Sequence, residues 1–424
     1  MINHKLYLDI LKQELVPAMG CTEPVAVAYA AALVREQLGG IPDRVSAQIC
    51  GNIIKNVKSV IVPNTGGMKG LKASIAVGIL GGDVRSELEV IAGVGEDVIR
   101  ALPSYIENTP IEIEPAHTPF KLDIDITAER GADTARVRIV NYHTNVVRIE
   151  KNGEIIKDIP TEATMQEDAL YNLEKQMCLH DILTFAAEAD LDEVRSLLEQ
   201  QISYNMAIAE EGMKNSYGAN VGKTYLKTFG DQTIVKAAAY AAAGSDARMN
   251  GCEMPVITLS GSGNQGITAS VPVVVYARDL GKTEEEMFRA LLVADLCAVH
   301  QKTEIGRLSA FCGAVNAGCG AACGIAYLTG AGEEEIAKTL TNTLAISAGI
   351  VCDGAKSSCA AKIVISLQTG LLGYRMQHAG EAFKGGDGLL GEDVEKTIAN
   401  IGRLGRYGMA ETDKEILKIM TEEN

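Results

Sequence analysis

The second part of the chain predicts a large helical region built from small residues. Helical patterns run from residue 166 almost to residue 421, and alanine and glycine fill many of their positions. The whole chain has 43 glycines in 424 residues, no tryptophan and only 4% aromatic residues. Small side chains let helix axes approach closely, so we expect tightly packed helices. The predicted helices are residues 166–177, 178–189, 191–211, 231–243, 283–300, 309–329, 332–350, 357–372 and 391–421, with an apolar stretch at 271–279 that we interpret as a buried helix rather than a strand.

The first part of the chain predicts a different architecture, in which helices alternate with short strands. The predicted helices are residues 4–17, 24–38, 68–80 and 86–105. Strand patterns occur within 44–62 and at 109–114, 121–127, 134–141 and 145–157, with a hairpin turn at Asn152-Gly153. We therefore predict an α+β protein. Residues 1–160 form an amino-terminal α+β domain with a small, mostly antiparallel sheet, and residues 161–424 form a large Ala/Gly-rich helical domain.

Charge and hydropathy limit the classes of function. The formal net charge of −16 argues against a nucleic-acid partner, because binding to phosphates needs a basic surface. The amino terminus lacks the apolar segment of a signal peptide, and no uncharged apolar run reaches about 18 residues. We therefore expect a cytoplasmic protein that does not span a membrane, in which disulfides are rare. Its ten cysteines are then core residues, catalytic thiols or metal ligands.

Three of these cysteines suggest an iron–sulfur site in the helical part. Cys352 and Cys359 flank a turn that contains Gly354, and Cys312 precedes them. Three thiolates would leave one iron of a cubane cluster open as a Lewis acid. A zinc site is an alternative from residue types alone. Cys312 also shares a stripe of the predicted helix 309–329 with Cys319 and Cys323, so these three thiols could instead pack in a core.

Cys21 is a candidate reactive thiol in the amino-terminal part. It directly precedes a predicted helix that begins at Thr22 or Glu23, with Pro24 in its first turn. The partial positive charge at a helix amino terminus lowers a thiol pKa and favours the thiolate. The alternative is a small buried residue in a turn.

Several polar segments are candidates for substrate binding. The glycine-rich loop 260–266 opens a helix, and its N–H groups could bind a cofactor phosphate or a substrate carboxylate, or form a structural turn. Arg307 could clamp a carboxylate with two hydrogen bonds. Asp246 and Arg248 offer an acid and a base one residue apart, a pattern that is often a surface ion pair.

Six motifs resemble, in order, the L-cysteine desulfidase family, which is related to the catalytic domain of bacterial iron–sulfur L-serine dehydratases. The motifs are GCTEP (20–24), YHTN (142–145), SDARMNG (245–251), SGSGNQGITA (260–269), GRLSAFC (306–312) and CDGAKSSC (352–359). The resemblance covers nearly the whole chain. It implies a [4Fe-4S] cluster held by Cys312, Cys352 and Cys359, and Cys21 as the base that removes the Cα proton. Cys319, which has no counterpart in the family pattern, is kept as a spare ligand because of its place on the predicted helix.

The resemblance also implies a reaction and a set of substrate contacts. The reaction is β-elimination of L-cysteine to sulfide, pyruvate and ammonia, with the open iron binding the leaving sulfur. The implied substrate-binding residues are Lys55, Asn56, His143, Asn145, Ser260, Ser262, Asn264 and Arg307. The carboxyl-terminal segment TDKEILKIMTEEN lacks the cysteine that the serine dehydratases place on the fourth iron, so we expect solvent or substrate there.

Three alternatives to a desulfidase remain at this stage. An iron–sulfur L-serine dehydratase would use the same cluster, because a β-hydroxyl and a β-thiol differ by one atom. A pyridoxal-phosphate lyase would use the loop 260–266 as a phosphate cup, although no Schiff-base lysine stands out. A metal- or redox-binding protein would keep the three cysteines without turnover. We expect a small amino-acid substrate, no nucleic-acid or membrane partner, and an assembly that is compatible with a homodimer.

Overall fold

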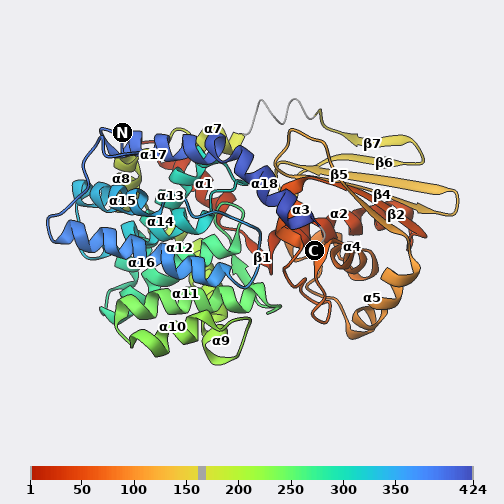
Figure 1. Ribbon diagram of the computed structural model, residues 1–424, viewed down its shortest axis with the longest axis horizontal. Helices are drawn as coiled ribbons and strands as arrows, with labels where there is room; N and C mark the ends of the chain where they lie inside the picture. Colours follow the sequence, from red (N-terminus) through yellow and green to blue (C-terminus); the bar gives the residue numbers. More distant parts are fainter. Residues whose placement is uncertain (1, 161–168, 423–424) are drawn as a thin grey trace.

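The computed structural model describes residues 2–160 and 169–422, and its architecture is α+β, as predicted. Figure 1 shows a part with a sheet and a larger helical part side by side. The elements of the first 160 residues are α1 (His4–Glu14), β1 (Pro17–Met19), α2 (Thr22–Leu38), β2 (Arg44–Ile49), α3 (Gly51–Val57), α4 (Gly70–Gly81), the 3-10 helix η1 (Val84–Glu89), α5 (Glu96–Asn108), β3 (Ile111–Pro115), β4 (Asp123–Arg130), β5 (Asp133–Val140), β6 (Val146–Lys151) and β7 (Glu154–Asp158).

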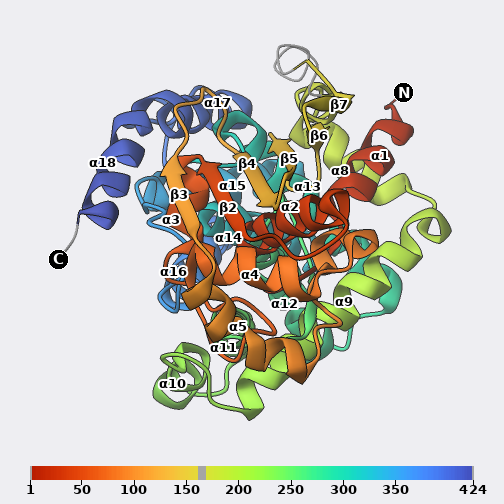
Figure 2. The ribbon, with the colours of Figure 1, turned by 90° about the vertical axis from the view of Figure 1, so that its right-hand side faces the viewer.

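A mixed sheet of six strands organises the first part. Its order is β3-β2-β4-β5-β6-β7, with β2 parallel to β3 and every other pair antiparallel. Alternate residues of β2, namely Val45, Ala47 and Ile49, are buried in the core that α2 and α4 complete. Figure 2, which views the molecule from the end that carries the sheet part, shows α2 and α4 next to each other. The predicted hairpin turn at Asn152-Gly153 joins β6 to β7 and is confirmed.

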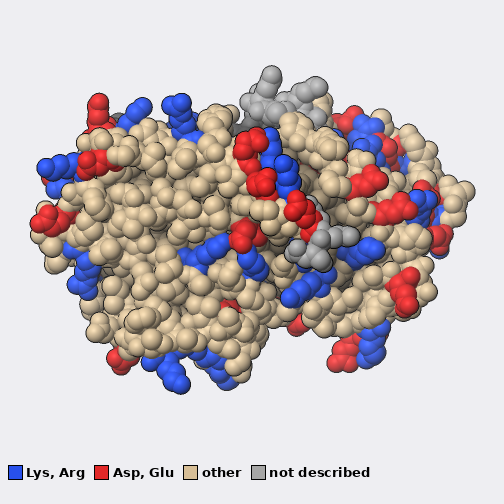
Figure 3. Space-filling model, in the orientation of Figure 1, with Lys and Arg blue, Asp and Glu red and all other residues tan. Residues whose placement is uncertain are grey.

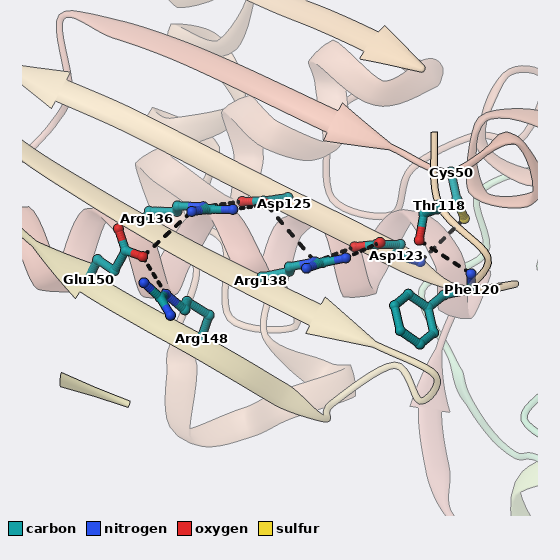
Figure 4. Close-up of polar contacts among 9 residues, drawn as sticks. All are labelled: Cys50, Thr118, Phe120, Asp123, Asp125, Arg136, Arg138, Arg148 and Glu150. Atoms are coloured by element: carbon teal, nitrogen blue, oxygen red, sulfur yellow. Dashed lines mark hydrogen bonds and ion pairs between the residues drawn. The ribbon is translucent and has the colours of Figure 1, made fainter. Parts of the chain in front are cut away.

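The opposite face of the sheet carries paired charges. Arg138 bonds Asp123 and Arg136 bonds Asp125, each with an Nη2–Oδ2 distance of 2.6 Å. Figure 4 shows these pairs in a row across the strands, continued by Glu150. Ion pairs between neighbouring strands stabilise a sheet face that no apolar layer covers.

The helical part contains the remaining elements. They are α7 (Ala169–Glu174), α8 (Leu179–Glu188), α9 (Leu191–Lys214), α10 (Val221–Phe229), α11 (Thr233–Met249), β8 (Pro255–Ile257), α12 (Gly263–Asp279), α13 (Glu284–Ile305), α14 (Gly313–Leu328), α15 (Glu333–Ser347), α16 (Cys359–His378), α17 (Val394–Arg403), the π turn η2 (Leu404–Gly408) and α18 (Ala410–Thr421). The stretch 271–279 is helical, as predicted. The first residues of the predicted helix 166–177 lie outside the described residues.

Glycines bring the helices of this part into close contact, as the composition predicts. A Cβ atom at Gly320 or Gly324 of α14 would lie 2.3 or 2.6 Å from a carbonyl oxygen of α13. These distances are far below van der Waals contact, so only glycine allows the two backbones to approach this closely. Helix α1 joins the same core through Leu6, Ile10 and Leu11.

Some predicted elements were wrong. Residues 51–57 lie within the stretch 44–62, for which strand patterns were predicted, but they form helix α3, because Ile53 and Val57 lie one turn apart and are buried on one face. The predicted helix 86–105 is divided into η1 and α5 around Gly93 and Gly95. The predicted helix 391–421 is interrupted by the π turn, and α10, β1 and β8 were not predicted.

The sheet part and the helical part have largely separate hydrophobic cores. One hydrophobic core comprises residues between 25 and 149, and the other comprises α1 and residues from 170 onward. The proposed domain boundary at residue 160 borders a segment outside the described residues and stays a prediction. Among the described helices, none has the length and apolar character that crossing a bilayer requires.

A buried carboxyl group leads to a prediction about stability. Asp295 of α13 is fully buried, and Gln201 of α9 donates Nε2 to both of its oxygens at 3.0 Å. Burial raises the pKa of Asp295 to about 7 from its ordinary 3.8. The folded-state pKa lies above the unfolded value, so ionisation destabilises the fold progressively between about pH 4 and pH 7 and fully above it.

We expect Asp295→Asn to raise the free energy of unfolding at pH 8 by on the order of 3 kcal/mol, because asparagine cannot ionise. The gain should fall to roughly a quarter of that value near pH 4.5, because the unfolded-state carboxyl group still ionises there. Urea unfolding at both pH values measures it, with the exposed Asp192→Asn as a control that should change stability by less than about 0.5 kcal/mol. A change in the free energy of unfolding that is the same at both pH values, or a loss at pH 8, would contradict the prediction.

Candidate active site

A cavity at the junction of the two parts collects the residues singled out in the sequence. This inner cavity has a volume of about 120 Å³ and is lined by residues of both parts. Its lining includes Cys21, Lys55, Asn56, His143, Ser260, Ser262, Asn264, Arg307, Cys312, Cys352 and Cys359. Asn145 is the one predicted site residue that does not line this cavity. Its Nδ2 donates to the Val140 oxygen at 2.9 Å, which supports the turn between β5 and β6.

A short antiparallel strand pair brings the first motif to the helical part. Strand β1 pairs with β8, and these strands lead into Cys21 and into the loop 260–266. The Thr22 hydroxyl then donates to the Gly261 oxygen at 3.1 Å. Gly20, at φ +60°, has no room for a Cβ atom, which would lie 2.2 Å from Pro63. Glycine is therefore required directly before Cys21.

Cys21 lies at the amino terminus of α2 and is bonded to a carboxylate. Its Sγ donates to Glu23 Oε2 at 3.0 Å, and the other Glu23 oxygen accepts from Asn56 Nδ2 at 3.0 Å. Burial and the neighbouring Glu23 raise the pKa of Cys21 well above its ordinary value, although Arg248 opposes them. The prediction of a lowered Cys21 pKa was therefore wrong, because burial and a carboxylate outweigh the helix dipole. Cys21 is a thiol in this state, with a proton acceptor in contact.

Glu23 is held as a carboxylate despite its burial. Burial acts to raise the pKa of Glu23, but His143 and the hydrogen bond from Cys21 outweigh it and keep the pKa low. The sequence placed Glu23 only at a helix start, so its contact with Cys21 was missed. Its position two residues after Cys21 in the first helical turn was the available signal.

The three predicted cluster ligands line the same wall of the inner cavity. A bridge between Phe311 and Val351 sets Cys312 and Cys352 side by side, with hydrogen bonds from the Cys312 N–H to the Ile350 oxygen (3.0 Å) and from the Cys352 N–H to the Ala310 oxygen (2.6 Å). Cys359 is the first residue of α16. All three thiols are free of disulfides.

The remaining cysteines of α14 belong to the helical core. The predicted helix 309–329 placed Cys312, Cys319 and Cys323 on one stripe. Helix α14 begins only at Gly313, so Cys312 is its N-cap residue and lies outside that stripe. Cys319 and Cys323 are fully buried and lie outside the lining of the inner cavity. Cys319 is therefore not placed with the other candidate ligands.

Three thiols without disulfides in one cavity are the type of ligand that iron–sulfur clusters use. Among the described residues, no three His, Cys, Asp or Glu side chains converge on a point where one metal ion would bind. The protein ligands of a cubane bind different irons, so three such thiolates need only line one cavity. Two lysines line the same cavity as these thiols. Lys302 is 4% exposed, with its pKa lowered to about 8 by burial, and Lys362 donates to the Val351 oxygen at 2.8 Å. Neither lysine lies in a motif, so the sequence did not indicate them.

Two predicted substrate-binding cations are already paired with protein carboxylates. Arg307 bonds Glu14 and lies 3.5 Å from Glu174, with its guanidinium 4.9 Å from the centre of the Tyr142 ring. Lys55 Nζ lies 2.5 Å from Asp413 Oδ1 of α18. Helix α18 thus reaches the sheet part, where it packs on α3 (Figure 1). In Figure 3, charged side chains gather where α18 runs along the junction.

Asp246 and Arg248 do not form the surface ion pair that their spacing allowed. Both are buried, at 1% and 2% exposure. The Asp246 carboxylate accepts from the Gly222 N–H at 2.9 Å and faces α10, whereas Arg248 lines the inner cavity. A residue and its second neighbour on a helix point in different directions, which separates the two side chains.

A wider outer cavity of about 430 Å³ adjoins the inner one. The two share Lys302, Arg307 and Ser260 in their linings, and the outer cavity is bordered by Arg406 and Asp413 of the carboxyl-terminal segment.

The imidazole of His143 lies in the inner cavity. Burial lowers the pKa of His143, although the negative charge of Glu23 acts to raise it. The His143 Nε2 has no hydrogen-bond partner among the described residues.

Gly354 leads to a prediction about the turn between Cys352 and Cys359. It has φ +92°, and a Cβ atom would lie 2.3 Å from the Lys55 carbonyl oxygen. Gly386 has the same φ but nothing within 4 Å, so it isolates the backbone effect. We expect Gly386→Ala to lower the free energy of unfolding by about 1 kcal/mol and Gly354→Ala by at least about 2 kcal/mol more. Denaturant unfolding of both variants measures this, and equal losses would contradict it.

Comparisons with known proteins agree with this geometry. The family model described as the serine dehydratase alpha chain matches residues 126–418. A UPF0597 protein of Desulfitobacterium hafniense is 51% identical over 420 residues, covering 98% of this chain and 96% of that protein. UPF0597 proteins of Treponema denticola and Lachnoclostridium phytofermentans are 47% and 46% identical, and the matches cover 99% and 98% of this chain and 99% of each of those proteins. The chain therefore belongs to the serine dehydratase alpha chain family.

Proposed function

We propose that this protein is a lyase that removes the β-sulfur of L-cysteine by β-elimination. The observation that carries the proposal is the meeting of Cys21 with Cys312, Cys352 and Cys359 in one cavity. A Cα–H bond is a weak acid, so its cleavage needs a base together with electrophilic help at the leaving group. The cavity offers residues for both tasks.

Cys312, Cys352 and Cys359 would hold a [4Fe-4S] cluster through three of its irons. The cluster, when bound, supplies a Lewis acid at its fourth iron for the leaving β-substituent. Lys302 and Lys362 would balance part of the negative charge of the thiolates. Asp353 bonds both Lys356 and Lys362 and thereby fixes the turn that precedes Cys359.

Cys21 and Glu23 would act together as the base. The Cys21 proton passes along the existing hydrogen bond to Glu23 Oε2, and the thiolate then takes the Cα proton. The electron pair of the Cα–H bond forms the Cα–Cβ double bond, and the pair of the Cβ–S bond leaves with sulfur. The resulting aminoacrylate tautomerises and hydrolyses to pyruvate and ammonia. Asn56 keeps the Glu23 carboxylate oriented toward Cys21.

L-serine is the second candidate substrate, because the matching family model is named for serine dehydratase. The same base and the same wall of thiols would serve a β-hydroxyl. Assaying sulfide from L-cysteine and pyruvate from L-serine on one preparation decides between them. A kcat/KM at least about tenfold higher for L-serine, or turnover that requires added pyridoxal phosphate, would contradict the desulfidase proposal.

The cluster assignment predicts the metal content of cysteine variants. Anaerobically purified protein should contain about four irons and four acid-labile sulfides per chain. Cys312→Ser, Cys352→Ser and Cys359→Ser should each lower the iron content and bleach the visible absorption. Cys178→Ser, at the start of α8 and outside the cavity lining, is the matched control and should retain both. Full iron in any of the first three variants would contradict that ligand assignment.

The base assignment predicts loss of turnover with the metal retained. Cys21→Ala should lower kcat by at least about 100-fold, because general-base catalysis contributes about that factor or more. Glu23→Gln should lower kcat to a similar extent, since its amide cannot take the Cys21 proton. Iron content and visible absorption should equal those of the wild type in both variants. Wild-type kcat in Cys21→Ala would contradict the role of this thiol.

A further inference from the structure

We propose that Arg248 and the amino-terminal turn of α12 together bind the α-carboxylate of the substrate. The proposal rests on the proposed function and adds to it the group that orients the amino acid. It assigns to Arg248 the role that the sequence suggested for Arg307.

Arg248 is a buried cation that forms no hydrogen bond or ion pair with residues 2–160 or 169–422. Its side chain is 2% exposed, and its Nε makes no hydrogen bond to any described residue. Nearby Glu23 does not pair with it, because the Glu23 oxygens accept from Asn56, Cys21 and Thr22. Burying a charge is unfavourable unless it is paired, so this guanidinium is suited to an anion that enters the cavity.

The amino terminus of α12 points at the same place. Helix α12 has 17 residues, and its capping residue Ser262 makes no side-chain cap hydrogen bond, so the N–H groups of the first turn lack that partner. A Cβ atom at Gly263, the first residue of the helix, would lie 2.5 Å from Arg248 Nε. Glycine therefore lets the guanidinium lie directly against the helix end, where the helix dipole also favours an anion.

The other cations of the cavity have partners or a different neighbourhood. Arg307 bonds Glu14, and Lys55 bonds Asp413. Burial and Glu14 raise the pKa of Glu174 to about 8, which leaves Glu14 as the principal partner of Arg307. Lys302 is influenced by Cys352 and Cys312 and belongs to the wall of thiols.

The position of Arg248 suits the chemistry at Cα. Arg248 lines the inner cavity together with Cys21, Glu23 and Cys359, and the charges of these groups influence its pKa. Met249, the next residue, packs against Cys21. In an amino acid Cα is bonded to the carboxylate carbon, so a carboxylate bound here holds Cα in the cavity that Cys21 also lines. Neutralising the carboxylate also makes the Cα proton easier to remove.

The test measures binding of an unreactive amino acid rather than turnover. L-alanine has the carboxylate and ammonium groups but no leaving group, and L-alaninamide differs only in lacking the carboxylate charge. The cluster-loaded wild type should prefer L-alanine by on the order of 100-fold in Kd, measured by anaerobic calorimetry. Arg248→Met should reduce this preference to less than about fivefold, and Arg248→Lys should retain part of it.

Two more variants separate the anchor from its neighbours. Gly263→Ala removes no charge but displaces the guanidinium, so it should also reduce the preference for L-alanine. Arg406→Met, in the outer cavity, is the matched control and should keep the full preference. If Arg248→Met does not fold, Arg248→Lys and Gly263→Ala decide the matter.

Each outcome bears on a different claim. An undiminished preference in Arg248→Met, or in both Arg248→Lys and Gly263→Ala, overturns the anchor while leaving the desulfidase proposal intact. Collapse of the preference in Arg307→Met, with Arg248→Met unaffected, assigns the carboxylate to Arg307 instead. Wild-type protein that binds iron but not L-alanine overturns the proposed function together with the anchor.

Discussion

The antiparallel pairing of β1 with β8 is the contact on which the candidate active site depends. Only three residue pairs form it, from Pro17 with Ile257 to Met19 with Pro255. Cys21 lies two residues beyond one strand, and the loop 260–266 lies three residues beyond the other. The sheet and helical parts have separate hydrophobic cores, so the position of Cys21 relative to the thiol wall depends on this small junction and on the contacts around it.

Most charges at the junction are paired. Glu14 bonds Arg307, Asp413 bonds Lys55, and Asp353 is shared between Lys356 and Lys362. A low-dielectric cavity makes such pairs strong and makes an unpaired charge expensive. Among the described residues, Arg248 and Lys302 are buried cavity cations without an ion pair. The thiols Cys312 and Cys352 influence Lys302, so Arg248 is the cation that suits the carboxylate of an amino acid. The same reasoning explains why Arg307, which looks equivalent in the sequence, is already occupied.

The sequence predicted local features of the chain better than the tertiary contacts that surround them. The Gly-containing turn at 352–359, the cap position of Cys21 and the helix opened by loop 260–266 follow from short-range rules, and the structure shows each of them. The pKa of Cys21 was mispredicted because it depends on burial and on Glu23, which a helix-dipole argument ignores. Lys302 was not foreseen because a lysine on a long helix is usually a surface residue. The partnership of Glu14 with Arg307 joins residues almost three hundred positions apart, which no local pattern reveals.

The bond between Lys55 and Asp413 also affects when the site can form during synthesis. The ribosome releases the chain from the amino end, so Cys21 and Lys55 emerge first and wait for the helices that carry the thiols. Asp413 lies on α18, the last described helix, and α18 packs on α3, which carries Lys55. Until α18 has emerged, Lys55 lacks its counter-ion and the border of the outer cavity is incomplete. The nascent chain therefore completes this site only after residue 413 has left the ribosome.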